Sequence, residues 1–184
     1  MSDNNYPPGN FCDQDSLLID GLVLTPPDQG AGFDDLLKLS HVTNSTFKNV
    51  RVLGGKQREN ALDVNNNSCG NSFENLDLYA GQECAILCKG GSSNNTWRET
   101  TILRSGGHCD VYIGDYSDQS HEWCKNNRFI DLARSDGDPV RVRWAWGDRP
   151  IVTGNSNVKF QYCLSAVSFL YVLFKTLLHP KLIS

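Results

Sequence analysis

A repeat built around large aromatic residues sharply narrows the folds open to this chain. The aromatic positions are 26, 24 and 32 residues apart, and they are Phe47, Phe73, Trp97 and Phe129. Each follows a polar segment that contains asparagine and precedes a short run of alternating apolar and polar residues. Such spacing is typical of chains in which one structural unit stacks on the next. The middle of the chain is therefore expected to be a repeat structure.

A second set of short segments lies between the aromatic positions. The segments are too short and too often interrupted by glycine to be helices, and their alternation is typical of strands. They are Leu37-Lys38-Leu39, Leu62-Asp63-Val64, Ile86-Leu87-Cys88, Val111-Tyr112-Ile113 and Val140-Arg141-Val142. We expect each to be the first strand of a repeat, with its middle residue pointing outward.

Stacking explains how such short strands bury their apolar side chains. Coils stacked at about 4.8 Å pair their backbones and form one apolar column. Asparagine at the corners tolerates a left-handed backbone and hydrogen-bonds to the asparagine one coil away. Cys84 and Cys109 each lie two residues before an inward position, so we expect them to stack as small apolar fillers. The predicted fold class is all-β, a right-handed single-stranded parallel β-helix of about five coils.

The asparagine-rich phrases of the repeat resemble a known family. They are Asn65-Asn66-Asn67-Ser68, Ser93-Asn94-Asn95-Thr96-Trp97-Arg98 and Asn126-Asn127-Arg128-Phe129-Ile130, and they resemble the repeats of the pectate-lyase-like right-handed parallel β-helix superfamily. The resemblance covers residues 16–163 and implies the fold. It implies no single function, because that superfamily includes lyases, hydrolases, epimerases, viral tail spikes and proteins of no known activity. Its members bind extended sugar chains on the flat faces of the stack.

The two ends of the chain differ from the repeat. Residues 1–15 are polar and are expected to form a flexible arm or a cap, before a β-helix over residues 16–163. Residues 164–184 are hydrophobic, and a helix is predicted there because glycine is absent and proline comes only at Pro180. We expect this segment to be a cap, or a contact in a homo-oligomer (a trimer, as in related viral spikes) or with a protein partner. A tail without a folded role and membrane association are the alternatives, although a span needs about 20 apolar residues.

Composition excludes some functions. The formal net charge is −4, and no cluster of Lys and Arg suggests a nucleic-acid partner. Residues 1–15 lack the basic start and apolar run of a secretory signal. The seven cysteines are expected to be mostly reduced and buried after synthesis in the cytoplasm, with a place in a virion left open. Neither a cofactor nor a metal is expected, because inward-pointing thiols such as Cys84 and Cys88 are poor zinc ligands.

The insertion at residues 114–125 is the first candidate for chemistry, since long loops on a regular scaffold often carry function. Its acid–base candidates for glycosidic cleavage are Asp115, Asp118, His121 and Glu122,. The aromatic side chains that could stack on sugar rings are Tyr112, Tyr116 and Trp123,. The competing interpretation is an ordinary polar loop with one anchoring aromatic residue.

The outer face and the last coil offer further candidates. The expected outward ladder is Lys38, Asp63, Leu87, Tyr112 and Arg141, which we interpret as a solvated face of mixed charge. Arg141 and Arg143 lie next to Trp144 and Trp146, a combination that could bind an anion or a sugar. The alternative, which we favour for the two tryptophans, is that they seal the end of the core.

These observations lead to three hypotheses about function. The first is a non-enzymatic β-helix module of viral or surface type that binds glycan or acts in assembly, with Tyr112, Tyr116, Trp123, Arg141 and Arg143 as ligand-binding residues. The second is a polysaccharide lyase or glycoside hydrolase that uses the 114–125 loop. The third is a structural protein that docks to a partner through its C-terminus.

Overall fold

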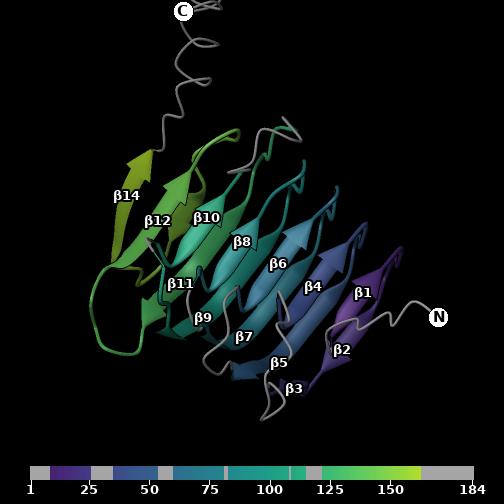
Figure 1. Cartoon of the computed structure of the whole chain (residues 1–184), viewed down its shortest axis with the longest axis horizontal. Coiled ribbons are helices and arrows are strands. Elements are labelled where there is room, and N and C mark those ends of the chain that lie inside the picture. Colours follow the sequence, from purple (N-terminus) through teal and green to yellow (C-terminus); the bar gives the residue numbers. More distant parts are fainter. Residues whose placement is uncertain are drawn as a thin grey trace, which may run out of the picture.

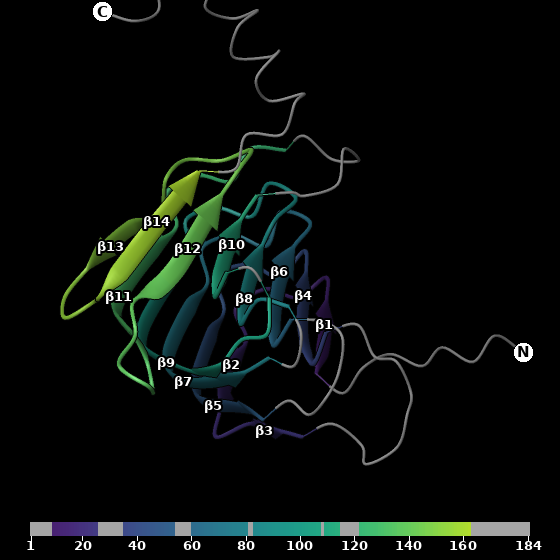
Figure 2. The same ribbon diagram turned by 60° about the vertical axis from the view of Figure 1, so that its left-hand side comes forward.

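The computed structural model describes residues 9–25, 35–53, 60–80, 83–107, 109–114 and 122–162. Within these ranges the secondary structure consists of strands, without a helix. The strands form a parallel β-solenoid of about five turns, which confirms the predicted all-β fold class. The described residues accordingly include no helix of the length and hydrophobicity needed to cross a bilayer. Figures 1 and 2 show the strands stacked side by side along the solenoid.

The strands form two parallel sheets. In spatial order, sheet 1 contains β1 (Asn10–Cys12), β4 (Leu37–Ser40), β6 (Leu62–Asn65), β8 (Ile86–Cys88), β10 (Val111–Ile113), β12 (Val140–Trp144) and β14 (Val158–Tyr162). Sheet 2 runs in the order β13 (Ile151–Thr153), β11 (Arg128–Arg134), β9 (Thr96–Arg104), β7 (Ser72–Tyr79), β5 (Thr46–Leu53) and β2 (Leu18–Asp20), and β3 (Val23–Leu24) also pairs with β5. Each coil from β4 to β13 therefore contributes one strand to each sheet.

Left-handed residues bend the chain at matching positions in successive coils. One column precedes sheet 2 and consists of Ser16, Asn44, Gly70, Asn94 and Asn126, with φ between 49° and 71°. A second column interrupts sheet 2 itself and consists of Gly21, Asn49, Asn75, Glu99, Asp131 and Gly154, with φ between 53° and 78°. Glycine and asparagine adopt this backbone readily, so their recurrence in the sequence sets the corners of the coil.

The aromatic residues of the repeat form one stack inside the solenoid. Ring centroids are 5.3 Å apart for Phe47 and Phe73, 5.1 Å for Phe73 and Trp97, and 4.6 Å for Trp97 and Phe129. All four side chains are fully buried. They meet because in-register parallel pairing places each one directly above the last. Aromatic pairs contribute about 0.5–1.5 kcal/mol each beyond the burial of their area.

Asparagine side chains link the coils, as the sequence predicted. In the buried ladder, Asn71 Nδ2 donates to Asn95 Oδ1 at 3.0 Å, and Asn95 Nδ2 donates to Asn127 Oδ1 at 3.3 Å. The same carbonyl oxygens also accept from backbone N–H groups one coil away. In an exposed ladder, Asn75 Nδ2 donates to Asn49 Oδ1 at 2.7 Å. The buried ladder thus satisfies polar groups that water does not reach.

The register of sheet 1 differs from the prediction where β12 pairs with β10. Val111 pairs with Val142, and Tyr112 therefore pairs with Arg143 instead of Arg141. The outward ladder is also not a solvated face, because Asp63, Leu87 and Tyr112 are buried. Side chains from three coils cover this region, and they form an outer cluster of Cys84, Leu87, Cys109, Tyr112, Ala145 and Trp146.

The outer cluster corrects the predicted place of three residues. Cys84 and Cys109 stack on neighbouring coils as expected, but they lie in this cluster and not in the central column. Trp146 also belongs to it, while Trp144 packs against the central core and meets Phe160 edge-on at 5.8 Å. Only Trp144 therefore lies where the predicted seal of the core would be.

The ends of the chain are described in part. Residues 10–12, within the predicted arm, form strand β1 and pair with β4. The predicted C-terminal helix at residues 164–184 lies outside the described residues.

Candidate functional site

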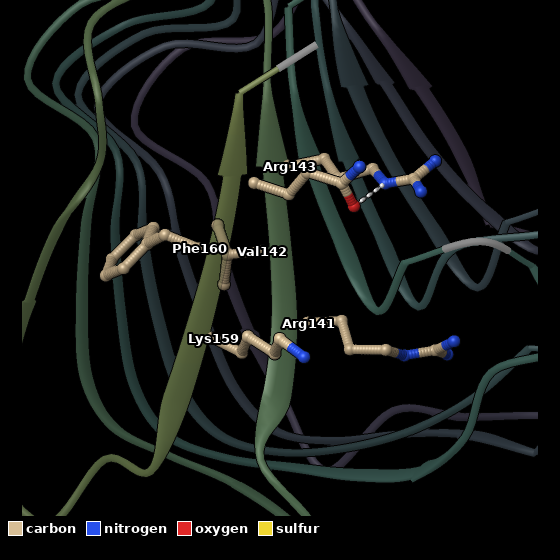
Figure 3. A pocket seen from close by; sticks show the side chains of 6 residues that line it. Arg141, Val142, Arg143, Lys159 and Phe160 are labelled. Carbon is tan, nitrogen blue, oxygen red and sulfur yellow. Dashed lines mark hydrogen bonds between the residues drawn. The ribbon is translucent and has the colours of Figure 1, made fainter.

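A pocket of about 370 Å³ lies over β12 and β14 at one end of sheet 1. We call it the basic pocket, and its lining consists of Arg141, Val142, Arg143, Lys159, Phe160 and Gln161. Figure 3 shows Arg141, Arg143 and Lys159 extending to one side of the two strands, and Phe160 to the other. The lining therefore includes three cationic side chains and no acidic one.

Strand alternation explains this arrangement. Val140 and Val142 point into the core, so Arg141 and Arg143 between and after them point outward,. On β14, Val158 and Phe160 pack against the core in the same way. Parallel pairing then places Arg141 beside Lys159 and Arg143 beside Gln161. Four long polar side chains thus form a two-by-two array on the outer face.

A buried carboxylate holds Arg141 in place. Asp110 Oδ1 accepts from Arg141 Nη2 at 3.0 Å and from Arg134 Nη1 at 2.7 Å, and it also accepts from the Ser105 hydroxyl. Burial alone would raise the pKa of Asp110, but the hydrogen bonds from Arg141 and Ser105 outweigh it and lower that pKa. The side chain of Arg141 is 41% exposed, so part of its guanidinium faces solvent.

Arg143 and Lys159 are the other two cations of the basic pocket, and their charges remain available to a ligand. Arg143 Nε donates to Gln161 Oε1 at 3.0 Å, which orients the guanidinium without neutralising it. Among the described residues, neither Arg143 nor Lys159 forms an ion pair. The pocket is therefore a positive site on a chain whose net charge is −4. Such a local patch attracts anions despite the overall charge.

The strand beneath the pocket is anchored from its inner side. The guanidinium of Arg149 lies 4.0 Å from the Phe160 ring centroid and 5.9 Å from that of Trp144. Cation–π contacts of this kind contribute about 0.5–1 kcal/mol at exposed sites. Together with the Trp144–Phe160 contact, they fix the edge strand β14, on which Lys159 and Gln161 lie.

Asp63 is a second group with an unusual environment, near the other end of the outer face. It is fully buried, and its Oδ2 lies 3.5 Å from Lys38 Nζ and 3.8 Å from Lys89 Nζ. Burial and the nearby charge of Asp35 raise the pKa of Asp63 to about 7. Perturbed carboxyl groups often mark functional sites. Asp63 is closed to solvent, however, whereas the basic pocket is open.

The structure unites only part of the predicted site. It brings Arg141 and Arg143 together in the basic pocket, while Tyr112 is buried in the outer cluster. Trp123 is 41% exposed and donates through Nε1 to Asp148 Oδ1 at 2.9 Å. Glu122 Oε2 accepts from Asn67 Nδ2 at 3.3 Å. The remaining candidates, Asp115, Tyr116, Asp118 and His121, lie outside the described residues.

Sequence reasoning missed Lys159 and Gln161. The signal that could have found them is the alternation in Val158-Lys159-Phe160-Gln161, which matches the earlier strands of sheet 1. In the described ranges, no group of three or more His, Cys, Asp or Glu side chains is arranged to hold a metal ion. Comparison of the chain with protein-family models, curated proteins and solved structures finds no match.

Proposed function

We propose that this chain is a glycan-binding β-helix module and that the basic pocket takes an acidic sugar chain. The observation that supports this most directly is the array of Arg141, Arg143 and Lys159 around one open pocket. Arginine binds carboxylate through two parallel N–H groups, and lysine adds a positive point charge. The uronate carboxylates of an acidic polysaccharide would supply the matching anions.

The shape of the surface supports an extended ligand. Neighbouring strands of sheet 1 present their outward side chains in register, about 4.8 Å apart,. The resemblance to the pectate-lyase-like superfamily, whose members bind extended sugar chains on such faces, favours the same class of ligand. The lining of the pocket contains no carboxylate, whereas glycosidic hydrolysis uses a pair of them,. This argues against hydrolysis at the pocket. Binding is the proposed activity, and cleavage by a lyase or a hydrolase is an outcome that the experiment detects.

The test is isothermal titration calorimetry of the full chain with polygalacturonate and, separately, with neutral dextran. We expect binding to polygalacturonate alone, weakened by salt because exposed charges are screened. The double variant Arg143→Ala/Lys159→Ala should bind about tenfold more weakly or worse, a loss of roughly 1.4 kcal/mol or more.

A matched control removes the same charge elsewhere. In Lys48→Ala/Arg51→Ala both changes fall on β5 of sheet 2, where the side chains pair with Glu74 and Asp77. This variant should keep most of the affinity of the unchanged chain. Equal affinity for both polymers, or equal losses in the two double variants, would overturn the proposal. Size-exclusion chromatography of the same mixtures detects shortening of the polymer, which would favour the enzyme hypothesis instead.

A further inference from the structure

Two thiols meet in the outer cluster. Cys84 and Cys109 occupy matching positions on neighbouring coils, each two residues before the paired residues Ile86 and Val111. Their Sγ atoms are 2.8 Å apart, and the residues are 3% and 2% exposed. Carbon atoms, which are smaller than sulfur, prefer non-bonded separations of about 3.5–4.0 Å. The two sulfurs therefore lie closer than ordinary packing would place them.

The backbone positions suit a covalent bond. A disulfide needs Cα atoms about 4.4–6.8 Å apart, and adjacent parallel strands are separated by about 4.8 Å. From 2.8 Å, the sulfurs need to approach by only about 0.8 Å more to reach bonding distance. Both residues are free cysteines in this structure. Register and side-chain direction thus already meet the main requirements for a bond.

We propose that Cys84 and Cys109 are a redox-sensitive pair that forms a disulfide between two adjacent coils by exchange with a small disulfide such as oxidised glutathione. The thiolate of one cysteine attacks a glutathione sulfur and expels one glutathione thiolate. The second cysteine then attacks the mixed disulfide and expels the other glutathione thiolate. The two cysteines lose two electrons and two protons, and one oxidised glutathione becomes two reduced molecules.

The surroundings make this exchange slow in both directions. The hydrogen bond with Cys109 and burial both raise the pKa of the Cys84 thiol, so Cys84 supplies little attacking thiolate,. Leu87, Tyr112 and Trp146 pack around the pair in the outer cluster. Exchange therefore requires local opening of the cluster, and a bond once formed is shielded from reductants in the same way.

The experiment equilibrates the full chain in buffers with graded ratios of oxidised to reduced glutathione. After an acid quench, free thiols are labelled with N-ethylmaleimide in denaturant and the chain is digested with trypsin and chymotrypsin. Cleavage after Leu87 separates Cys84 from Cys88, and cleavage after Tyr112 separates Cys109 from Cys124. We expect a linked peptide pair that contains Cys84 and Cys109, lacks two hydrogen atoms and is more abundant than any other pair. Labelling of both cysteines at every ratio would overturn the proposal.

Thermal unfolding gives an independent readout. A disulfide between Cys84 and Cys109 closes a loop of about one coil. It should raise the melting temperature of the oxidised chain by about 6–12 °C over the reduced chain. Cys84→Ala and Cys109→Ala should each abolish this difference. Cys12→Ala, which removes an exposed cysteine outside the pair, should preserve it. A redox-dependent shift that persists in Cys84→Ala, or is absent from the unchanged chain, would contradict the assignment.

Discussion

Asp110 accepts hydrogen bonds from both the backbone and the side chain of Arg141. Its Oδ2 accepts from the Arg141 backbone N at 2.7 Å and from Nε at 3.2 Å, while Oδ1 accepts from Nη2 at 3.0 Å. Arg134, at the end of β11, donates to the same Oδ1. One buried carboxylate therefore connects the two sheets and sets the position of a cation in the basic pocket.

Replacing this carboxylate should destabilise the chain. We expect Asp110→Asn to lower the free energy of unfolding by about 3 kcal/mol, the lower end for a broken buried ion pair, because both arginines are partly exposed,. Urea denaturation at neutral pH measures the loss. The control Asp77→Asn removes the partner of the half-exposed Arg51 and should cost less than about 1 kcal/mol,. Similar losses in the two variants would contradict the structural role of Asp110.

The pKa of Asp110 also predicts how this loss depends on pH. A carboxyl pKa that is lower in the folded chain stabilises the fold above the ordinary value of 3.8, and the effect disappears as pH falls through the folded pKa,. The stability difference between the unchanged chain and Asp110→Asn should therefore shrink on acidification below about pH 4. Denaturation curves over this range provide the check.

The contribution of Asp63 to stability should depend on pH in the opposite direction from that of Asp110. Its folded pKa is raised from 3.8 to about 7, so its contribution is greatest below pH 3.8 and falls as pH rises to about 7. The slope approaches about 1.4 kcal/mol per pH unit between these limits. Asp63→Asn should remove this slope from a plot of unfolding free energy against pH. Asp35→Asn should end the decline at a lower pH, since the charge of Asp35 helps to raise the folded pKa of Asp63. Parallel curves for all three chains would argue against this assignment.

Among the left-handed residues that interrupt sheet 2, Glu99 has the side chain least suited to that backbone. Its φ is 53°, and its register neighbour Asn75 belongs to an asparagine ladder. Glu99→Asn should raise the free energy of unfolding by about 0.5–1 kcal/mol, because asparagine adopts this backbone more readily and can extend the ladder. Glu99→Ala keeps the Cβ and adds no hydrogen bond, so it should bring no gain. Thermal and urea unfolding of the two variants would distinguish these effects.

Asn95 is the central member of the buried ladder. Its Oδ1 accepts from the backbone and side chain of Asn71, and its Nδ2 donates to the Ser68 carbonyl at 2.9 Å. Asn95→Ala leaves these partners buried and unsatisfied, which should cost about 3 kcal/mol in urea denaturation. Asn94 occupies the neighbouring exposed position and has a φ of 58°. Asn94→Gly should change the free energy of unfolding by only a few tenths of the loss expected for Asn95→Ala. A small effect of Asn95→Ala would mean that water replaces the lost side chain.

The sequence was sufficient to predict the solenoid because local and long-range signals coincide. Phe47, Phe73 and Trp97 recur at the coil length, and the asparagines that suit the corners are also the residues that link them. A period-two pattern fixes which face a side chain occupies, but it does not distinguish registers that differ by two residues. Val140 and Val142 are both apolar, so the sequence allows either to pair with Val111. The predicted ladder therefore contains Arg141 where the structure has Arg143.

Burial on the outer face could not be predicted in the same way. Tyr112 occupies an outward position, as its alternation indicates, but Trp146 of the next coil packs with it in the outer cluster. The pKa of Asp63 likewise depends on residues of two other coils, because the charge of Asp35 raises it and the charge of Lys89 lowers it. Such contacts arise from the lateral arrangement of coils, and one strand's pattern carries no information about them. The basic pocket is a different case, because the alternation in Val158-Lys159-Phe160-Gln161 does indicate a further strand of sheet 1 beside Arg141 and Arg143.

In-register stacking also has a consequence for how the chain folds. The strand partners of Phe73 are 26 residues before it and 24 residues after it. The strand pairings of the described residues can therefore form by closing loops of about one coil, which costs much less entropy than closing the whole chain. Folding can begin at any adjacent pair of coils and spread in both directions, and the aromatic stack grows by one ring with each step.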